Sequence, residues 1–203
     1  FFFFSKELIF HQLDHFHEGQ YLGGGFNFLE TGNLWIDNFV GTGLFVDVLL
    51  SPISWDIFNQ VSIGSTRLFV SILNLILHFF LIYFFYNLII LINFEKYLRL
   101  LFIIPFFLIS LYLVNSNYLN FRDIPIILSL SLIIILLIER SDRFFLKILA
   151  LGILSPVSFL LSIEKGVYLN ILFFFLILTF FLIKEYKWIK YFIIFVLLSW
   201  VAL

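Results

Sequence analysis

Long apolar runs fill the chain from Thr66 onward and constrain its fold more than any other feature. They cover residues 66–94, 98–114, 124–138, 144–163, 167–183 and 191–203. An apolar helix of about 20 residues crosses the hydrocarbon core of a bilayer while satisfying its own backbone hydrogen bonds. Hydrophobic residues make up 63% of the chain and charged residues 12%, which does not fit a soluble domain. We predict an all-α integral membrane protein, a multi-span helical bundle.

A polar segment, residues 5–65, precedes the transmembrane helical region at 66–203. Six of the 13 acidic residues and three of the four histidines lie between His11 and Asp56. Glycines interrupt this segment, and we expect Gly23–Gly25 and Gly41–Gly43 to form turns. The segment is therefore predicted to be a long first loop that carries short helices.

Both ends of the sequence lie in apolar residues. Residues 1–4 have neither the basic flank nor the cleavage site of a signal peptide, so we interpret them as the end of a truncated membrane helix. The last run, 191–203, is too short to cross a core of about 30 Å. We therefore expect the sequence to be a fragment truncated at both ends.

Lysine and arginine gather on the cytoplasmic side of membrane proteins, so their distribution predicts the orientation. If the polar loop lies outside, the inner connections hold eight of the 12 lysines and arginines, and the outer connections hold four. The inner residues are Lys96, Arg99, Arg140, Arg143, Lys147, Lys184, Lys187 and Lys190, and the outer ones are Lys6, Arg67, Arg122 and Lys165. We predict an extracytoplasmic acidic loop and a location in a bacterial inner membrane.

Two further expectations concern the connections between the spans. Glu164–Gly166 is predicted to form a tight turn between two spans. The short run 124–138 would measure about 22 Å as a helix, less than the hydrocarbon thickness. We therefore expect it inside the bundle near the functional cavity, with Arg122 and Asp123 at its outer mouth.

The segment DHFHEG, residues 14–19, combines carboxylates and imidazoles at close spacing. Helical spacing places Asp14 and Glu18 on one face, and extended spacing places His15 beside His17. Such a set supplies a general base, or holds a divalent cation through Asp14, Glu18 and His17. The simpler alternative is a loop whose charges are only solvated. Net charge −1 argues against a nucleic-acid partner, and the absence of cysteine excludes thiolate chemistry.

The order of features resembles the GT-C superfamily of polytopic membrane glycosyltransferases. More narrowly, DHFHEGQYL, TGNLWIDNFVGTGLFVD, SPISW and GSTR are similar to an uncharacterised branch of bacterial integral-membrane sugar transferases. There, an Asp-x-x-His-Glu-Gly element precedes a turn ending in Asp and a His-Gly element leading to a further Asp. The positions that fit are Asp14, His17, Glu18, Gly19, Asp37, Gly43 and Asp47. Thr42 stands where the second His is expected, so the chain departs from the pattern there.

This resemblance implies transfer of a sugar from a polyprenyl-phosphate-linked donor to an acceptor outside the membrane. Asp14 is our first choice as general base, with a pKa raised by neighbouring negative charge, and Glu18 is the second. Supporting and phosphate-binding roles are assigned to further residues: His15, His17, Asp37 and Asp47 as supports, and Arg67, Arg122 and Lys165 as the cations. For these cations the alternative is an interfacial anchor that reaches toward the lipid head groups.

Two other classes of function remain open. A membrane transporter or flippase would need charged or broken helices near the membrane centre, where this sequence offers His78 and a few prolines. The third class is a non-catalytic membrane component of an envelope-assembly complex.

Overall fold

The computed structural model describes residues 14–35, 38–93, 95–116, 118–138 and 144–202, and every regular element in these ranges is a helix. Four helices in them are long and apolar enough to cross a membrane: Ile63–Leu91, Tyr97–Asn115, Phe144–Leu161 and Ile163–Leu182. The predicted class, an all-α integral membrane protein, is confirmed. The expected membrane helix at residues 1–4 lies outside the described residues.

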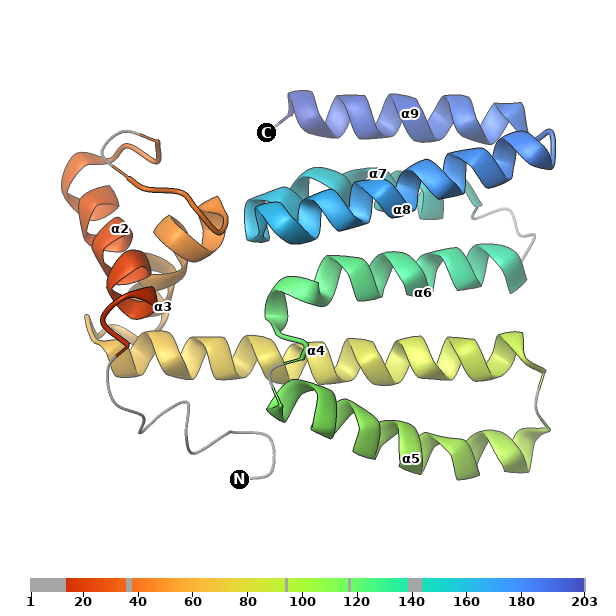
Figure 1. Cartoon of the computed structure of the whole chain (residues 1–203), viewed down its shortest axis with the longest axis horizontal. Coiled ribbons are helices and arrows are strands. Elements are labelled where there is room, and N and C mark those ends of the chain that lie inside the picture. The colour runs from red at the N-terminus through yellow and green to blue at the C-terminus, as the bar shows by residue number, and fades with distance from the viewer. Residues whose placement is uncertain (1–13, 36–37, 94, 117, 139–143, 203) are drawn as a thin grey trace.

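Six helices run side by side in alternating directions, and the shorter elements gather at one end of them (Figure 1). The bundle consists of α4 Ile63–Leu91, α5 Lys96–Asn115, α6 Ile124–Ile138, α7 Phe144–Leu161, α8 Ile163–Leu182 and α9 Tyr186–Val201. The shorter elements are α2 His17–Thr31, the π-helix η1 Phe45–Leu49, α3 Leu50–Phe58 and the 3-10 helix η2 Phe121–Asp123. We call the end of the bundle that carries α2, η1 and α3 the loop end, and the opposite end the far end.

Two helix boundaries differ from the predicted ones. Helix α4 begins at Ile63, before Thr66, because the Ser62 hydroxyl accepts a hydrogen bond from the amide of Ser65 at 3.1 Å. The predicted turn at Glu164–Gly166 is wrong, since these residues form the first turn of α8. The chain instead breaks at Ser162, where the amide of Ile163 donates to the carbonyl of Thr42 at 2.7 Å. A residue of the first loop therefore accepts a hydrogen bond from the first amide of α8.

The short helix α6 joins the two halves of the bundle. Its buried Ile127 packs in one apolar cluster with Leu77 and Leu81 of α4. Its buried Leu136 packs in a second cluster with Ile148 of α7 and Phe173 of α8. The prediction that residues 124–138 lie inside the bundle is confirmed.

Helix α2 contains the glycines that were expected to form turns. Gly24 packs so closely on η1 that a Cβ atom there would lie 2.1 Å from the carbonyl oxygen of Asp47, and one at Gly25 would lie 2.8 Å from Pro52. The expectation of a turn at Gly23–Gly25 is therefore wrong, because these residues lie in a helix and Gly24 and Gly25 allow it to approach η1 and α3. Gly41–Gly43 lie outside regular structure, in a bend of the first loop.

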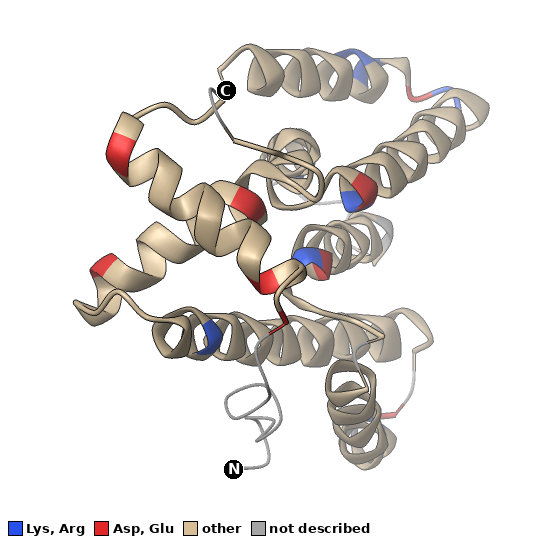
Figure 2. Ribbon diagram, turned by 60° about the vertical axis from the view of Figure 1, so that its left-hand side comes forward, with Lys and Arg blue, Asp and Glu red and all other residues tan. Residues whose placement is uncertain are grey.

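The lysines and arginines that the structure describes lie at both ends of the bundle, in unequal numbers. Arg67, Arg122 and Lys165 lie at the loop end, near the start of α4, in η2 and in the first turn of α8, and Figure 2 shows basic and acidic positions close together there. The others lie at the far end: Arg99, Lys147, Lys184, Lys187 and Lys190. The extracytoplasmic position of the loop end follows from this asymmetry as a prediction.

Candidate functional site

A cavity of about 250 Å³ lies at the loop end, between α2, η1, α4 and η2. Segments far apart in sequence supply its walls, because α4 bonds to α2 through Arg67 and, two turns later, to η2 through Asn74. The lining residues are His17, Glu18, Gln20, Tyr21, Thr42, Val46, Asp47, Leu50, Arg67, Val70, Asn74, Asn120, Phe121 and Arg122. The cavity is therefore a polar site at the end of an apolar bundle.

A buried ion pair fixes α2 to α4 at one side of the cavity. Arg67 Nε donates to Glu18 Oε1 at 2.6 Å, and Arg67 Nη2 donates to Glu18 Oε2 at 2.7 Å. Both residues are only 8% exposed, and the amide of Asp14 donates to Glu18 Oε2 at 2.9 Å. Burial raises the pKa of Glu18, but these hydrogen bonds outweigh it and hold the pKa below its ordinary value. Glu18 is thus a poor base, and its ion pair with Arg67 attaches α2 to α4.

Tyr21 lies on the next turn of α2 and completes this side of the cavity. Burial raises the pKa of its hydroxyl, and the charge of Glu18, to which the hydroxyl donates, raises it further. Tyr21 therefore remains a neutral hydrogen-bond donor over the physiological pH range.

Asp14 and His17 form a second pair at the start of α2. His17 Nδ1 lies 2.7 Å from Asp14 Oδ2, and Asp14 Oδ1 accepts from the amides of Phe16 and His17, both at 3.1 Å. The amide and the ring of His17 hold the pKa of Asp14 below its ordinary value, so the expected rise is wrong. Because an ionised carboxylate only accepts, Nδ1 is the donor and Nε2 is the nitrogen that can take a proton. His17 lines the cavity, whereas Asp14 orients it from outside the lining.

Arg122 differs from the two other loop-end cations in having no carboxylate partner among the described residues. Its Nε donates to Asn120 Oδ1 at 3.0 Å. Arg67 is paired with Glu18, and Lys165 Nζ lies 2.9 Å from Asp123 Oδ1. Lys165 is also absent from the cavity lining. Arg122 is therefore the lining cation best able to receive an anion.

Asp47 holds the segment Val40–Leu44, which we call the strap. Its Oδ2 accepts from the amides of Gly41, Thr42 and Gly43 at 2.8, 2.6 and 3.1 Å, and the residue is 1% exposed. The strap in turn contacts the α7–α8 junction, since a Cβ atom at Gly43 would lie 2.7 Å from the carbonyl oxygen of Leu161. Asp47 therefore positions the strap, and Thr42 on it lines the cavity.

The fold brings five of the predicted site residues to one cavity and separates others from it. His17, Glu18, Asp47, Arg67 and Arg122 line it. The exposed His15 does not line it, and Asp37 lies outside the described residues.

Asn74 and Asn120 are lining residues that the sequence argument did not place in the site. Asn74 Oδ1 accepts from the amide of Phe121 at 2.8 Å and so attaches η2 to α4. A spacing of seven residues after Arg67 puts Asn74 two turns along the same helix face, which is a signal available in the sequence.

The hypothesis of a cation held by Asp14, His17 and Glu18 does not fit this geometry. Within the described ranges, no three or more carboxylate, imidazole or thiol side chains converge as metal ligands. The Glu18 carboxylate binds Arg67, and Asp14 binds His17. These three side chains therefore do not form a ready ligand set.

Comparison with known protein families, curated proteins and solved structures finds no match for this chain. The site must therefore be interpreted from its own residues.

Proposed function

We propose that the chain transfers a sugar from a polyprenyl-phosphate-linked donor to an extracytoplasmic acceptor, in the assembly of a cell-envelope glycan or glycolipid. The observation that carries this proposal is Arg122, a cation without a carboxylate partner among the described residues, which lines the same cavity as His17 of the His17–Asp14 pair. A lipid-linked donor presents its phosphate near the membrane surface, and the residues that line the cavity lie at one end of the apolar helices.

Arg122 receives the donor phosphate in this proposal. A guanidinium presents several donors in a fixed plane and binds phosphate oxygens through two of them. The bond between the anomeric carbon and the phosphate oxygen breaks during transfer, and the polyprenyl phosphate leaves with added negative charge. Arg122 stabilises this charge as it develops.

The His17–Asp14 pair takes the proton of the acceptor hydroxyl. The acceptor oxygen bonds to the anomeric carbon as its proton passes to His17 Nε2. Asp14 holds the ring by Nδ1 and stabilises the imidazolium that results. Glu18 keeps α2, and with it His17, in place through Arg67.

Lipid analysis tests this function. Cells that lack the protein should accumulate unconsumed polyprenyl-linked sugar, and the wild-type chain should remove it. Arg122→Gln should leave the accumulation largely in place, because the variant loses the charge that holds the leaving phosphate. The matched control is Arg99→Gln, the same substitution at the far end, which should restore consumption.

No accumulation on deletion would contradict a transferase and favour a transporter or a non-catalytic component. Full restoration by Arg122→Gln would remove Arg122 from the site.

A further inference from the structure

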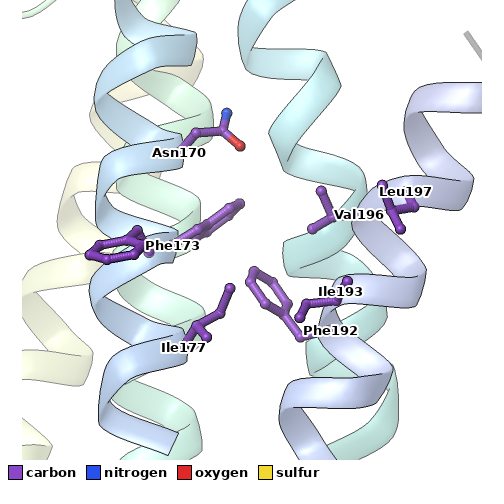
Figure 3. A pocket seen from close by; sticks show the side chains of 8 residues that line it. Asn170, Phe173, Ile177, Phe192, Ile193, Val196 and Leu197 are labelled. Atoms are coloured by element: carbon purple, nitrogen blue, oxygen red, sulfur yellow. The ribbon is translucent and has the colours of Figure 1, made fainter. Parts of the chain in front are cut away.

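Two asparagines of the bundle helices bond their side-chain amides to their own helix. Asn87 Nδ2 donates to the carbonyl of Tyr83 at 2.9 Å, and Asn170 Nδ2 donates to the carbonyl of Gly166 at 2.8 Å. Asn170 lines the cavity between α8 and α9 together with apolar side chains (Figure 3), and its Oδ1 accepts from Ser155 Oγ at 2.8 Å. In both asparagines the carbonyl four residues earlier takes the side-chain donor.

Asn74 of α4 differs from these two asparagines. Its side chain is only 9% exposed, and its Oδ1 accepts from the amide of Phe121 at 2.8 Å, which identifies the other end of the side chain as Nδ2. Nδ2 has no acceptor among the described residues, although the carbonyl of Val70 lies four residues earlier on the helix. Because Asn74 lines the cavity at the loop end, a buried donor is left for a ligand of that cavity.

Two apolar residues adjoin Asn74 in the cavity lining. Val70 lies one helical turn before it on the same face of α4, and Phe121 is joined to it by the backbone hydrogen bond. A sugar hydroxyl that accepted from Nδ2 here would turn its own proton toward apolar groups, and a buried donor without a partner is costly. A carbonyl oxygen only accepts, so it is the better partner for Nδ2.

An acetamido group matches both features of this place. Its carbonyl oxygen accepts from an amide donor, and its methyl group packs against apolar side chains. In an N-acetylhexosamine the acetamido group is on the carbon next to the anomeric carbon, to which the phosphate is attached. Asn74 bonds to Phe121, the residue that precedes Arg122 in η2, so η2 connects the amide donor directly to the phosphate-binding cation.

We propose that the donor sugar is an N-acetylhexosamine whose acetamido carbonyl accepts from Asn74 Nδ2, with the acetamido methyl group against Val70 and Phe121; this inference rests on the proposed function. Asn74 then determines which sugar is selected, and Arg122 binds the phosphate that all such donors share. A hexose has a hydroxyl in place of the acetamido group, and the proton of that hydroxyl would face the apolar side chains.

Binding to the purified full chain in detergent tests this proposal. The probes are polyprenyl phosphate N-acetylglucosamine and polyprenyl phosphate glucose, which share the lipid and the phosphate and differ only in the acetamido group. The wild-type protein should bind the N-acetylated probe at least about tenfold more tightly, because a buried donor discriminates against a ligand that cannot pair with it well. Equal binding of the two probes, or tighter binding of the glucose probe, would overturn the proposal.

Two variants test the donor and its surroundings separately. Asn74→Asp keeps an oxygen for the amide of Phe121 but removes the Nδ2 donor, so the preference should be lost. The matched control is Asn33→Asp, at an exposed position outside the cavity lining, which should keep the preference. Val70→Thr keeps the shape of the side chain and offers an oxygen to a sugar hydroxyl, so it should strengthen glucose binding and narrow the preference. The exposed Val167→Thr is its control.

The Val70→Thr result decides the matter should Asn74→Asp fail to fold. An unchanged preference in folded Asn74→Asp or in Val70→Thr would overturn the proposal, as would equal losses in Asn74→Asp and Asn33→Asp.

Deletion of the protein separates this inference from the function on which it rests. Accumulation of lipid-linked sugar on deletion, combined with equal binding of the two probes, would refute the N-acetylhexosamine assignment and leave the transferase standing. Preference for the N-acetylated probe without accumulation on deletion would refute the transferase and leave the acetamido site standing.

Discussion

Glu18 and Arg67 lie 49 positions apart in the sequence, yet they form a two-point ion pair that is almost shielded from solvent. Such a pair adds little to stability relative to apolar residues of the same size, but removing one partner leaves a buried charge uncompensated. Its main effect here is therefore geometric, since it fixes where α2 meets α4. His17 and Tyr21 owe their position at the cavity to this contact.

Glu18→Gln should destabilise the loop end by about 3 kcal/mol, because Arg67 would keep its charge without a carboxylate. The thermal midpoint followed by tryptophan fluorescence measures this, since the buried Trp55 lies on α3. Glu30→Gln, an exposed change on the same helix, is the control and should have little effect. Equal midpoints for Glu18→Gln and the wild type would refute the clamp.

The same pair predicts a dependence of stability on pH. The pKa of Glu18 is lower in the folded protein than its ordinary value of 4.5. The stabilisation is therefore complete above about pH 4.5 and is lost as the pH falls through the lower folded-state pKa. The difference in midpoint between the wild type and Glu18→Gln should shrink below pH 4.5, and a difference that grows there would contradict this assignment.

His17→Gln should reduce sugar transfer about a hundredfold, because the variant retains a polar side chain but cannot accept the proton. His15→Gln is the matched control, since His15 is exposed and does not line the cavity. Transfer measured in membranes with equal amounts of folded protein compares the two. Similar losses in both variants would show that His17 has no special role.

At the scale of elements, the strap depends on contacts from both of its sides. Asp47 of η1 binds three consecutive strap amides, and Thr42 accepts from the first amide of α8. These bonds connect the short helices of the loop end to the α7–α8 junction. The strap is thereby positioned at the edge of the cavity that its Thr42 lines.

Asp47→Ala should release the strap and destabilise the loop end by about 1–3 kcal/mol, because three amides lose their acceptor. Limited proteolysis should then cut within residues 40–44, and the thermal midpoint should fall. Asp56→Ala, at an exposed carboxylate of α3, should change neither. Wild-type resistance to proteolysis in Asp47→Ala would show that other contacts hold the strap.

At the scale of the whole molecule, the helical bundle separates two chemically different ends. The loop end carries the cavity and the cations Arg67, Arg122 and Lys165, and the far end carries Lys184, Lys187 and Lys190. This asymmetry predicts that the loop end faces the outside of the cell.

Single cysteines test this orientation, because the chain has no native cysteine. Cysteines in place of the exposed Glu30 and Tyr118 should react with an impermeant thiol reagent applied outside, and a cysteine in place of Lys187 should not. Permeabilised cells, in which all three should react, are the control. The reverse pattern would contradict both the orientation and the proposed function.

Sequence alone determined the class of this protein and most of its spans, because the bilayer requires apolar helices of a set length. Within the described ranges, two helix ends differed from the predicted ones. A local cap at Ser62 starts α4 earlier, and the carbonyl of Thr42, in a distant segment, bonds to the first amide of α8. Only the tertiary structure decided that Glu18 is a clamp for Arg67 and that Asp47 holds the strap. The physical reason is that a carboxylate's role depends on which donors reach it, and here a decisive donor comes from another helix.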